Sequence, residues 1–112
     1  MLDLSHLPLQ FETSSQALPA ARAHLVHAHI GNCVMKPGHR LYGDLHPRFG
    51  TPNGENDVEE LTDFMRVLLE IGYIKPGSTN VVAFEVRPHG MESSEAVIAN
   101  AKRTLESAWR KV

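Results

Sequence analysis

The sequence predicts an α/β fold in which short parallel strands alternate with helices. Three apolar segments have the composition of buried strands, namely residues 1–8, 25–31 and 80–88. Helix-forming segments separate and follow them, and this alternation favours parallel pairing with right-handed crossovers. The strand segments are nearly continuous apolar runs, which is typical of parallel sheets that are covered on both faces. The expected order is β-α-β-loop-α-β-α.

The best-marked helix lies in the middle of the chain. Asn56 or Asp57 can cap its start, acidic residues follow in its first turn, and Gly72 is placed to end it. Apolar residues recur between these points at helical spacing. We therefore expect a helix that packs one face against the sheet.

Two further helices are expected at the ends of the chain. Ser93 or Ser94 opens the last helix, whose apolar face extends to Trp109. A weaker helix is expected over residues 15–24, and it contains Pro19, for which the first turn is the compatible position.

Length and composition describe one ordinary globular domain, residues 1–112. Apolar residues make up 42% of the chain and charged residues 21%, and the net charge of -2 argues against binding nucleic acid or an anionic membrane. A single cysteine, Cys33, excludes an internal disulfide and fits a reducing compartment. The N-terminus lacks the pattern of a signal peptide, so we expect a cytoplasmic protein. Seven histidines are an unusually large number for this length.

Polar residues stand at the expected carboxyl ends of all three strands. Asp3 and His6 flank the end of the first strand, His29 precedes the end of the second, and Glu85 lies three residues before Pro88. An unpaired charge inside a strand is costly, and functional groups gather at this edge of parallel sheets. One polar position on each strand predicts a shared site.

The long loop over residues 32–57 adds Asp44 and His46. Asp, Glu and neutral His suit Mn²⁺, Zn²⁺, Mg²⁺ or Co²⁺, and we therefore predict a divalent metal site. Each residue also has an ordinary structural role open to it. Glu85 can be an ion-pair partner, and Asp44 and His46 can shape a turn.

Two more residues are candidates for substrate binding. His27 is read first as a core histidine, with substrate binding as the alternative. Arg87 lies two residues beyond Glu85, on the same strand face, and could bind a phosphate or carboxylate. A solvated arginine is an equally good interpretation of that position.

The polar motifs resemble those of the xylose-isomerase-like TIM-barrel superfamily. In chain order they are Asp3-x-x-His6, His29-Ile-Gly, Asp44-x-His46 and Phe84-Glu85. That superfamily contains sugar and sugar-phosphate isomerases and epimerases and the endonuclease IV type of nuclease. The segment GENDVEELTDFMRVLLEIGY also looks like the helix before the final strand of the epimerase branch. The resemblance covers essentially the whole chain and implies a partial (β/α)8 barrel, about the last three β/α units.

The resemblance also implies roles for the site residues. The residues that match the superfamily's shared metal ligands are Asp3, His29 and Glu85. The residues that match the further metal set of the nuclease branch are His6, Asp44 and His46. In the epimerase branch Glu85 would double as an acid/base catalyst and His6 would face the substrate. A fourth ligand of the family, a glutamate on an earlier strand, is not in this chain.

The leading functional hypothesis is a divalent-metal-dependent sugar or sugar-phosphate isomerase or epimerase. The alternatives are a metallo-nuclease acting on abasic DNA, and a non-catalytic fragment or metal-binding association module. A (β/α)8 barrel takes about 250 residues, so we expect the chain to be a C-terminal fragment, or to be completed by self-association or by an N-terminal partner. In isolation we expect little turnover.

Overall fold

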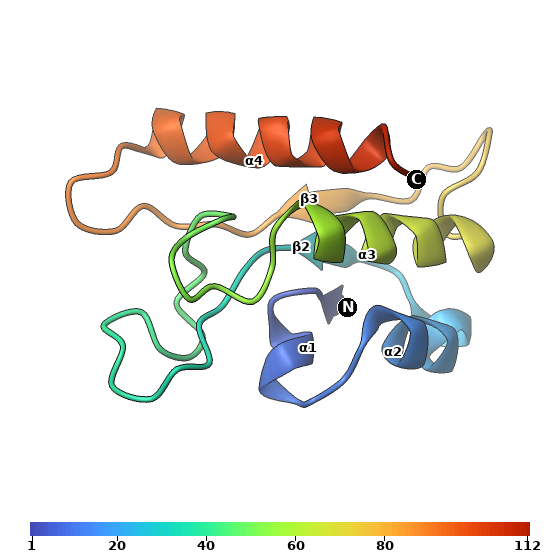
Figure 1. Cartoon of the computed structure of the whole chain (residues 1–112). Coiled ribbons are helices and arrows are strands. Elements are labelled where there is room, and N and C mark those ends of the chain that lie inside the picture. The colour runs from blue at the N-terminus through green and yellow to red at the C-terminus, as the bar shows by residue number, and fades with distance from the viewer.

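The computed structural model describes the whole chain, Met1–Val112, as an open parallel sheet with helices around it (Figure 1). The strands are β1 (Leu2–Asp3), β2 (Ala28–Ile30) and β3 (Val82–Phe84). Their spatial order is β1-β2-β3, and both pairings are parallel. The parallel pairing is the one that the alternating sequence pattern predicts.

The prediction of a partial (β/α)8 barrel, about the last three β/α units, was wrong. The structure shows a small α/β fold with a three-stranded sheet, and each strand contains only two or three residues. A barrel requires eight tilted strands that close on one another, whereas β1 and β3 each keep one unpaired edge. The motifs behind the prediction describe how single strands lead into their loops. They contain no information about closure of the sheet.

The strand register places the polar residues at one level of the sheet. Asp3 pairs with His29, and His29 in turn pairs with Ala83. Ala28 and Ile30, on either side of His29, are fully buried in the hydrophobic core. Because successive side chains of a strand point to opposite faces, His29 is directed away from that core.

The first strand is shorter than the expected segment 1–8. It ends at Asp3, whose carboxylate accepts a hydrogen bond from the backbone nitrogen of Ser5 at 2.9 Å. This local bond turns the chain out of the sheet, since such side-chain bonds compete with strand pairing. The helix α1 (His6–Leu9) follows at once and buries Leu7.

Helix α2 (Ser14–Ala21) begins earlier than predicted and continues into a short 3₁₀ helix, Arg22–His24. Thr13 caps it through a reciprocal pair of hydrogen bonds with Gln16. Because the cap fixes the start at Ser14, Pro19 falls in the second turn, and its expected place in the first turn was wrong.

Helix α3 (Val58–Glu70) confirms the helix predicted in the middle of the chain. Asp57 is the residue before its first turn, and its backbone nitrogen donates to the Glu60 carboxylate at 3.2 Å. Gly72 follows the helix with φ at +78°, a conformation that glycine adopts without strain.

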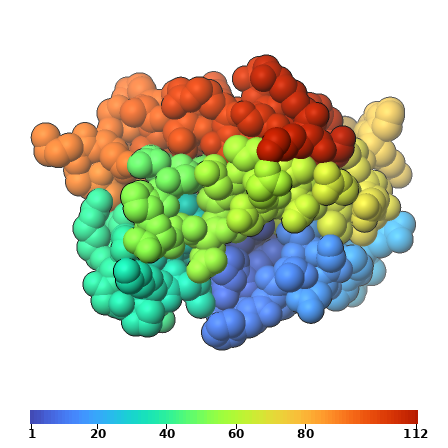
Figure 2. All heavy atoms as spheres, viewed as in Figure 1, coloured from blue at the N-terminus to red at the C-terminus, as the bar shows by residue number.

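Helix α4 (Ser94–Trp109) is the last element, and Ser93 caps it by accepting from the Ala96 nitrogen at 3.1 Å. Helix α3 packs against both α2 and α4. The space-filling view shows α4 covering one side of the molecule, with the N-terminal residues and the long loop on the other side of α3 (Figure 2).

The hydrophobic core lies between the helices and the sheet. Its fully buried members include Leu18, Ile30, Phe49, Leu61, Phe64 and Leu68. Cys33 is also fully buried, and burial, followed by the nearby carboxylate charges, raises the pKa of its thiol to about 12. The thiol is therefore a small packed group, as the sequence suggests. None of the helices combines the length and the apolar character that crossing a bilayer requires.

Candidate metal centre

Asp3 is the most deeply buried member of the predicted site, with 3% of its surface exposed. One carboxylate oxygen, Oδ1, accepts hydrogen bonds from the backbone nitrogen and the hydroxyl of Ser5, at 2.9 and 2.8 Å. The other oxygen, Oδ2, is buried and has no hydrogen-bond donor. A buried carboxylate oxygen without a hydrogen-bond partner lowers the stability of the fold. Such unpartnered atoms are therefore uncommon in folded proteins.

His29 and Glu85 bring their side chains to the same place from the neighbouring strands. His29 Nδ1 lies 2.8 Å from Glu85 Oε2. Glu85 follows β3 directly, and its backbone nitrogen donates to the Ile30 carbonyl at 2.9 Å, so the chain stays aligned with β2 beyond the last strand residue. Ligand atoms of Asp3, His29 and Glu85 all lie within 4.8 Å of one another.

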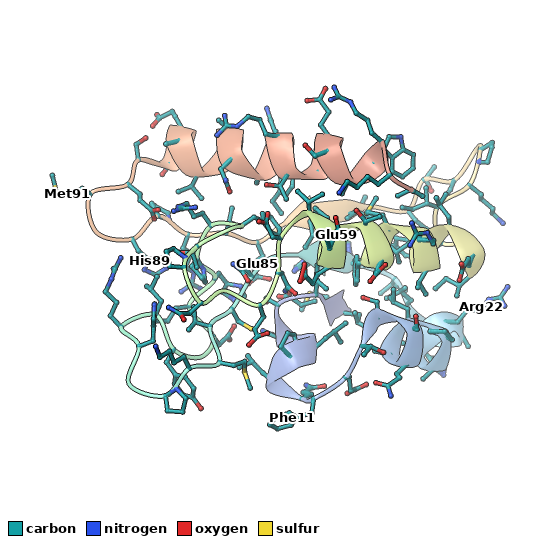
Figure 3. The ribbon with its side chains drawn as sticks, in the orientation of Figure 1. Phe11, Arg22, Glu59, Glu85, His89 and Met91 are labelled. Atoms are coloured by element: carbon teal, nitrogen blue, oxygen red, sulfur yellow. The ribbon has the colours of Figure 1, made fainter.

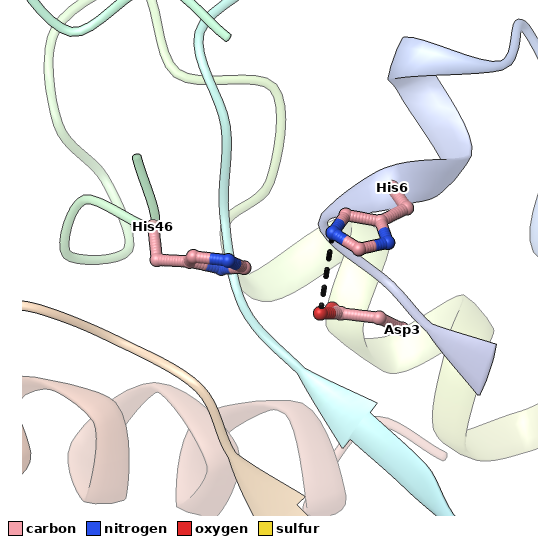
Figure 4. A group of neighbouring side chains, drawn as sticks. All are labelled: Asp3, His6 and His46. Carbon is pink, nitrogen blue, oxygen red and sulfur yellow. Dashed lines mark ion pairs between the residues drawn. The ribbon is translucent and has the colours of Figure 1, made fainter. Parts of the chain in front are cut away.

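A second group of three forms around the same Asp3 carboxylate (Figure 4). It consists of Asp3 at the end of β1, His6 at the start of α1, and His46 from the long loop. Their ligand atoms also lie within 4.8 Å of one another, and His6 Nε2 is 3.8 Å from Asp3 Oδ2. Asp3 therefore belongs to both groups.

Asp44 completes the cluster from the exposed side. Its Oδ1 atom lies 3.0 Å from His6 Nε2 and 2.8 Å from His46 Nε2. His46 Nε2 also lies 3.4 Å from Glu85 Oε1, which links the two groups of three. All six predicted ligands thus meet in one cluster at the carboxyl end of the sheet.

The loop is held in place around His46 by backbone contacts. His46 has a positive φ of +51°, which few residues other than glycine adopt. The backbone nitrogen of Arg87 donates to the His46 carbonyl at 2.8 Å. This bond ties the loop to the chain beyond β3 and directs the ring of His46 into the cluster. Its side chain is almost fully buried there.

Charge is concentrated in this cluster, which combines three carboxylates with three imidazoles. The neighbouring side chains, Asp3 first and then His29 and His46, hold the pKa of Glu85 below its ordinary value, whereas burial acts in the opposite direction. In Figure 3 Glu85 lies toward the middle of the view, with its side chain 34% exposed, whereas Phe11, Arg22 and Met91 project at the margins.

The donor set fits a divalent cation. Carboxylate oxygen and imidazole nitrogen are ligands of Zn²⁺, Mn²⁺ and Co²⁺, and no thiolate takes part. The Oδ2 atom of Asp3, which has no hydrogen-bond partner, supports the fit between this donor set and a cation. A bound cation would give this buried oxygen the favourable charge interaction that no hydrogen-bond donor provides. A surface hollow lined by Asp3 and His6, together with Leu2, Gln10 and Ala17, opens beside the cluster.

The two predicted substrate-binding residues lie outside the cluster. His27 is exposed and immediately precedes β2, two residues before His29, so its interpretation as a core histidine was wrong. Arg87 is exposed too, and only its backbone contacts the cluster, through His46.

The sequence reasoning missed two buried polar residues that support the site. Ser5 contacts both Asp3 and His46. Asn56 donates to the carbonyls of Gly31 and Leu4, at 3.0 and 3.4 Å, and thereby joins the ends of β2 and β1. A serine two residues after an aspartate is a known signal for a side-chain-to-backbone turn. No comparable signal marks Asn56.

Comparisons with known proteins identify no family for this chain. Neither family models, nor curated proteins, nor solved structures give a significant match to it. The function of the chain must therefore be inferred from the carboxylates and imidazoles of the cluster.

Proposed function

We propose that this chain binds a divalent cation, Mn²⁺, Zn²⁺, Mg²⁺ or Co²⁺, at the cluster and acts as a sugar or sugar-phosphate isomerase or epimerase. The observation that carries the proposal is the buried Asp3 Oδ2 atom, which lacks a donor although imidazole and carboxylate groups surround it. The order of the motifs along the chain, which resembles the xylose-isomerase-like superfamily, supports the choice of reaction.

Asp3, His29 and Glu85 would hold one cation, and Asp3, His6 and His46 would hold a second. A bound divalent cation would supply Lewis acidity, which polarises a carbonyl oxygen and makes the adjacent C–H group more acidic. Asp44, the most exposed member of the cluster, faces Nε2 of both His6 and His46 and would be a further ligand of that second cation.

Glu85 is the best candidate for the acid/base group. Its carboxylate can accept a proton from the carbon next to the carbonyl and return it, and the neighbouring groups that lower its pKa favour the ionised form that this step requires. His6 is 38% exposed in its side chain and borders the hollow, where it would face the substrate. Arg87 would bind the phosphate group of a sugar phosphate. His27, which lies outside the cluster, has no role in the proposed reaction.

The proposed partner is a small-molecule sugar or sugar phosphate. We place the protein in the cytoplasm, because its single cysteine forms no internal disulfide and suits a reducing compartment. The net charge of -2 gives no support for a nucleic-acid partner.

Metal analysis tests the binding step. The purified protein is dialysed against Zn²⁺ or Mn²⁺, and its bound metal is measured beside that of the Asp3→Ala and Glu85→Ala variants. The expected result is bound metal in the wild type and a large loss in both variants. Asp63→Ala, which removes an exposed carboxylate on α3, is the matched control and should bind like the wild type. Unchanged metal content in both cluster variants would contradict the proposal.

Hydrogen exchange tests the reaction. Metal-loaded protein is incubated with aldose and ketose phosphates in D₂O, and deuterium at the carbon next to the carbonyl is followed by NMR. We expect exchange with the wild type and none with Glu85→Gln. Equal exchange with both proteins would exclude Glu85 as the proton acceptor.

One observation favours a second candidate, a metallo-nuclease acting on abasic DNA. His6, Asp44 and His46, which match the further metal set of the nuclease branch, lie together beside Asp3, and phosphate-ester hydrolysis commonly uses more than one cation. Cleavage of an oligonucleotide with an abasic site, lost in His46→Ala, would support this candidate. Metal binding with neither activity would support the non-catalytic alternative.

A further inference from the structure

Ser5 is a fully buried residue whose hydroxyl contacts two of the proposed ligands at once. Its Oγ atom lies 2.8 Å from Asp3 Oδ1 and 3.3 Å from His46 Nδ1. Ser5 lies two residues beyond the end of β1, and its contact with His46 comes from a loop 41 residues away. Gly31 lies opposite, where an added Cβ would stand only 3.4 Å from the Ser5 Cβ.

The contacts of Ser5 determine which oxygen of Asp3 faces the cluster. Both the backbone nitrogen and the hydroxyl of Ser5 donate to Oδ1. Rotation of the Asp3 carboxylate would break both hydrogen bonds between two buried side chains, so the carboxylate is held in one orientation. Oδ2 is then the oxygen left for a cation, and it is the atom without a donor.

The same hydroxyl determines which nitrogen of His46 faces the cluster. A serine hydroxyl has one hydrogen, and an ionised carboxylate can only accept, so the Ser5 hydrogen is donated to Asp3. Ser5 Oγ can then only accept from His46, which places a hydrogen on Nδ1. Nε2 is left pointing at Asp44 Oδ1, 2.8 Å away, and Glu85 Oε1, 3.4 Å away.

We propose that Ser5 is a positioning residue of the metal centre, which orients Asp3 and selects Nε2 of His46 as a ligand atom through one shared hydroxyl. The inference rests on the proposed metal binding and deepens it. Partners of this kind fix the orientation of ligands and the tautomer of histidine, and their loss weakens metal affinity about 10–100-fold. Because Asp3 belongs to both groups of three, the effect would reach both proposed cation positions.

Zinc titration with a competing chelator tests the proposal on wild type, Ser5→Ala and Ser5→Thr. We expect the dissociation constant of Ser5→Ala to rise about 10–100-fold and Ser5→Thr, which keeps the hydroxyl, to recover most of the affinity. Ser14→Ala removes another buried serine hydroxyl, in α2, and is the matched control with unchanged affinity. Equal affinity of Ser5→Ala and wild type would overturn the proposal while leaving the metal site standing. Absence of zinc binding by the wild type would overturn the proposed function and this inference with it.

A second measurement needs no variant. ¹⁵N NMR of the zinc-loaded wild type reports which nitrogen of His46 carries hydrogen and which binds metal. We expect hydrogen on Nδ1 and zinc on Nε2. Zinc on Nδ1 of His46 in the wild type would overturn the proposal even if Ser5→Ala did not fold.

Discussion

The helical side of this molecule encloses an apolar core, whereas the carboxyl end of its sheet gathers carboxylate and imidazole side chains. Between the helices and the sheet, Leu61, Phe64 and Leu68 are fully buried in a continuous apolar core. At the strand ends, three carboxylates and three imidazoles converge, and the buried Oδ2 atom of Asp3 has no donor.

The two regions also differ in what they contribute to the free energy of folding. Removing apolar surface from water stabilises the folded state, whereas gathering carboxylates in a partly buried place opposes it. An arrangement that costs stability yet is held by specific hydrogen bonds is typical of functional sites. The core thus supports the sheet, and the sheet supports a cluster that would gain from a cation.

The largest effect is expected from the core. Phe64→Ala should lower the free energy of unfolding by roughly 3–5 kcal/mol, because it removes a fully buried ring and leaves a cavity. Urea denaturation followed by circular dichroism measures the change. Phe11→Ala is the matched control, since Phe11 is 86% exposed and its loss should change little. A small effect at Phe64 would show that the core does not carry the fold.

Adding metal should stabilise the protein through the cluster at the carboxyl end of the sheet. At a free Zn²⁺ concentration 100 times the dissociation constant, the free energy of unfolding should rise by about 2.7 kcal/mol per site. Thermal denaturation with and without zinc measures the gain, and a chelator should reverse it. Asp3→Asn should lose the gain, whereas an equal gain in that variant would place the zinc elsewhere.

Asn56 links the two regions, because it joins the ends of β1 and β2 at the start of α3. Asn56→Ala should lower the free energy of unfolding by about 1–3 kcal/mol, since it leaves the Gly31 carbonyl without its side-chain donor and removes one of the two donors to the Leu4 carbonyl. Asn100→Ala is the control, because the side-chain oxygen of Asn100 has no partner. Equal denaturation midpoints for the two variants would contradict a linking role for Asn56.

Cys33 should make the protein less stable in alkaline solution. Its pKa is raised to about 12 in the folded protein, from an ordinary value of 9.0. The unfolded thiol therefore ionises first, and stability should fall by roughly 1 kcal/mol per pH unit between these values. Urea denaturation at increasing pH, with Cys33→Ala as the comparison, measures the slope. Rapid alkylation of the native thiol at pH 8 would contradict its burial.

The smallest effect is expected at the exposed pair Glu59 and Lys111. A hydrogen bond with Lys111, and then its charge, lower the pKa of Glu59, so the pair stabilises the fold above the ordinary pKa of Glu59 and loses this effect on acidification. Exposed pairs contribute little, and Lys111→Ala should leave the denaturation midpoint at pH 7 nearly unchanged. A clearly lower denaturation midpoint for Lys111→Ala would mean that Lys111 also holds the C-terminal end of the chain against α3.

The sequence was most informative about the two long helices. The apolar spacing predicts both helices, and each pair of candidate caps, Asn56 or Asp57 and Ser93 or Ser94, contains the residue that caps α3 or α4, because those signals are local. It was less informative about the N-terminal elements. A run of apolar residues over 1–8 suits a strand, yet one side-chain bond from Asp3 turns the chain into α1 after two strand residues.

For the site, the sequence by itself determined which side chains meet. Parallel strands bring their carboxyl ends to one edge, so the polar residues at those ends form one cluster with His46 of the loop. Only the tertiary structure decided that the sheet is open, that His27 is exposed, and that Ser5 lies between Asp3 and His46. These features depend on contacts between segments far apart in the chain, and no local pattern of residues specifies such contacts.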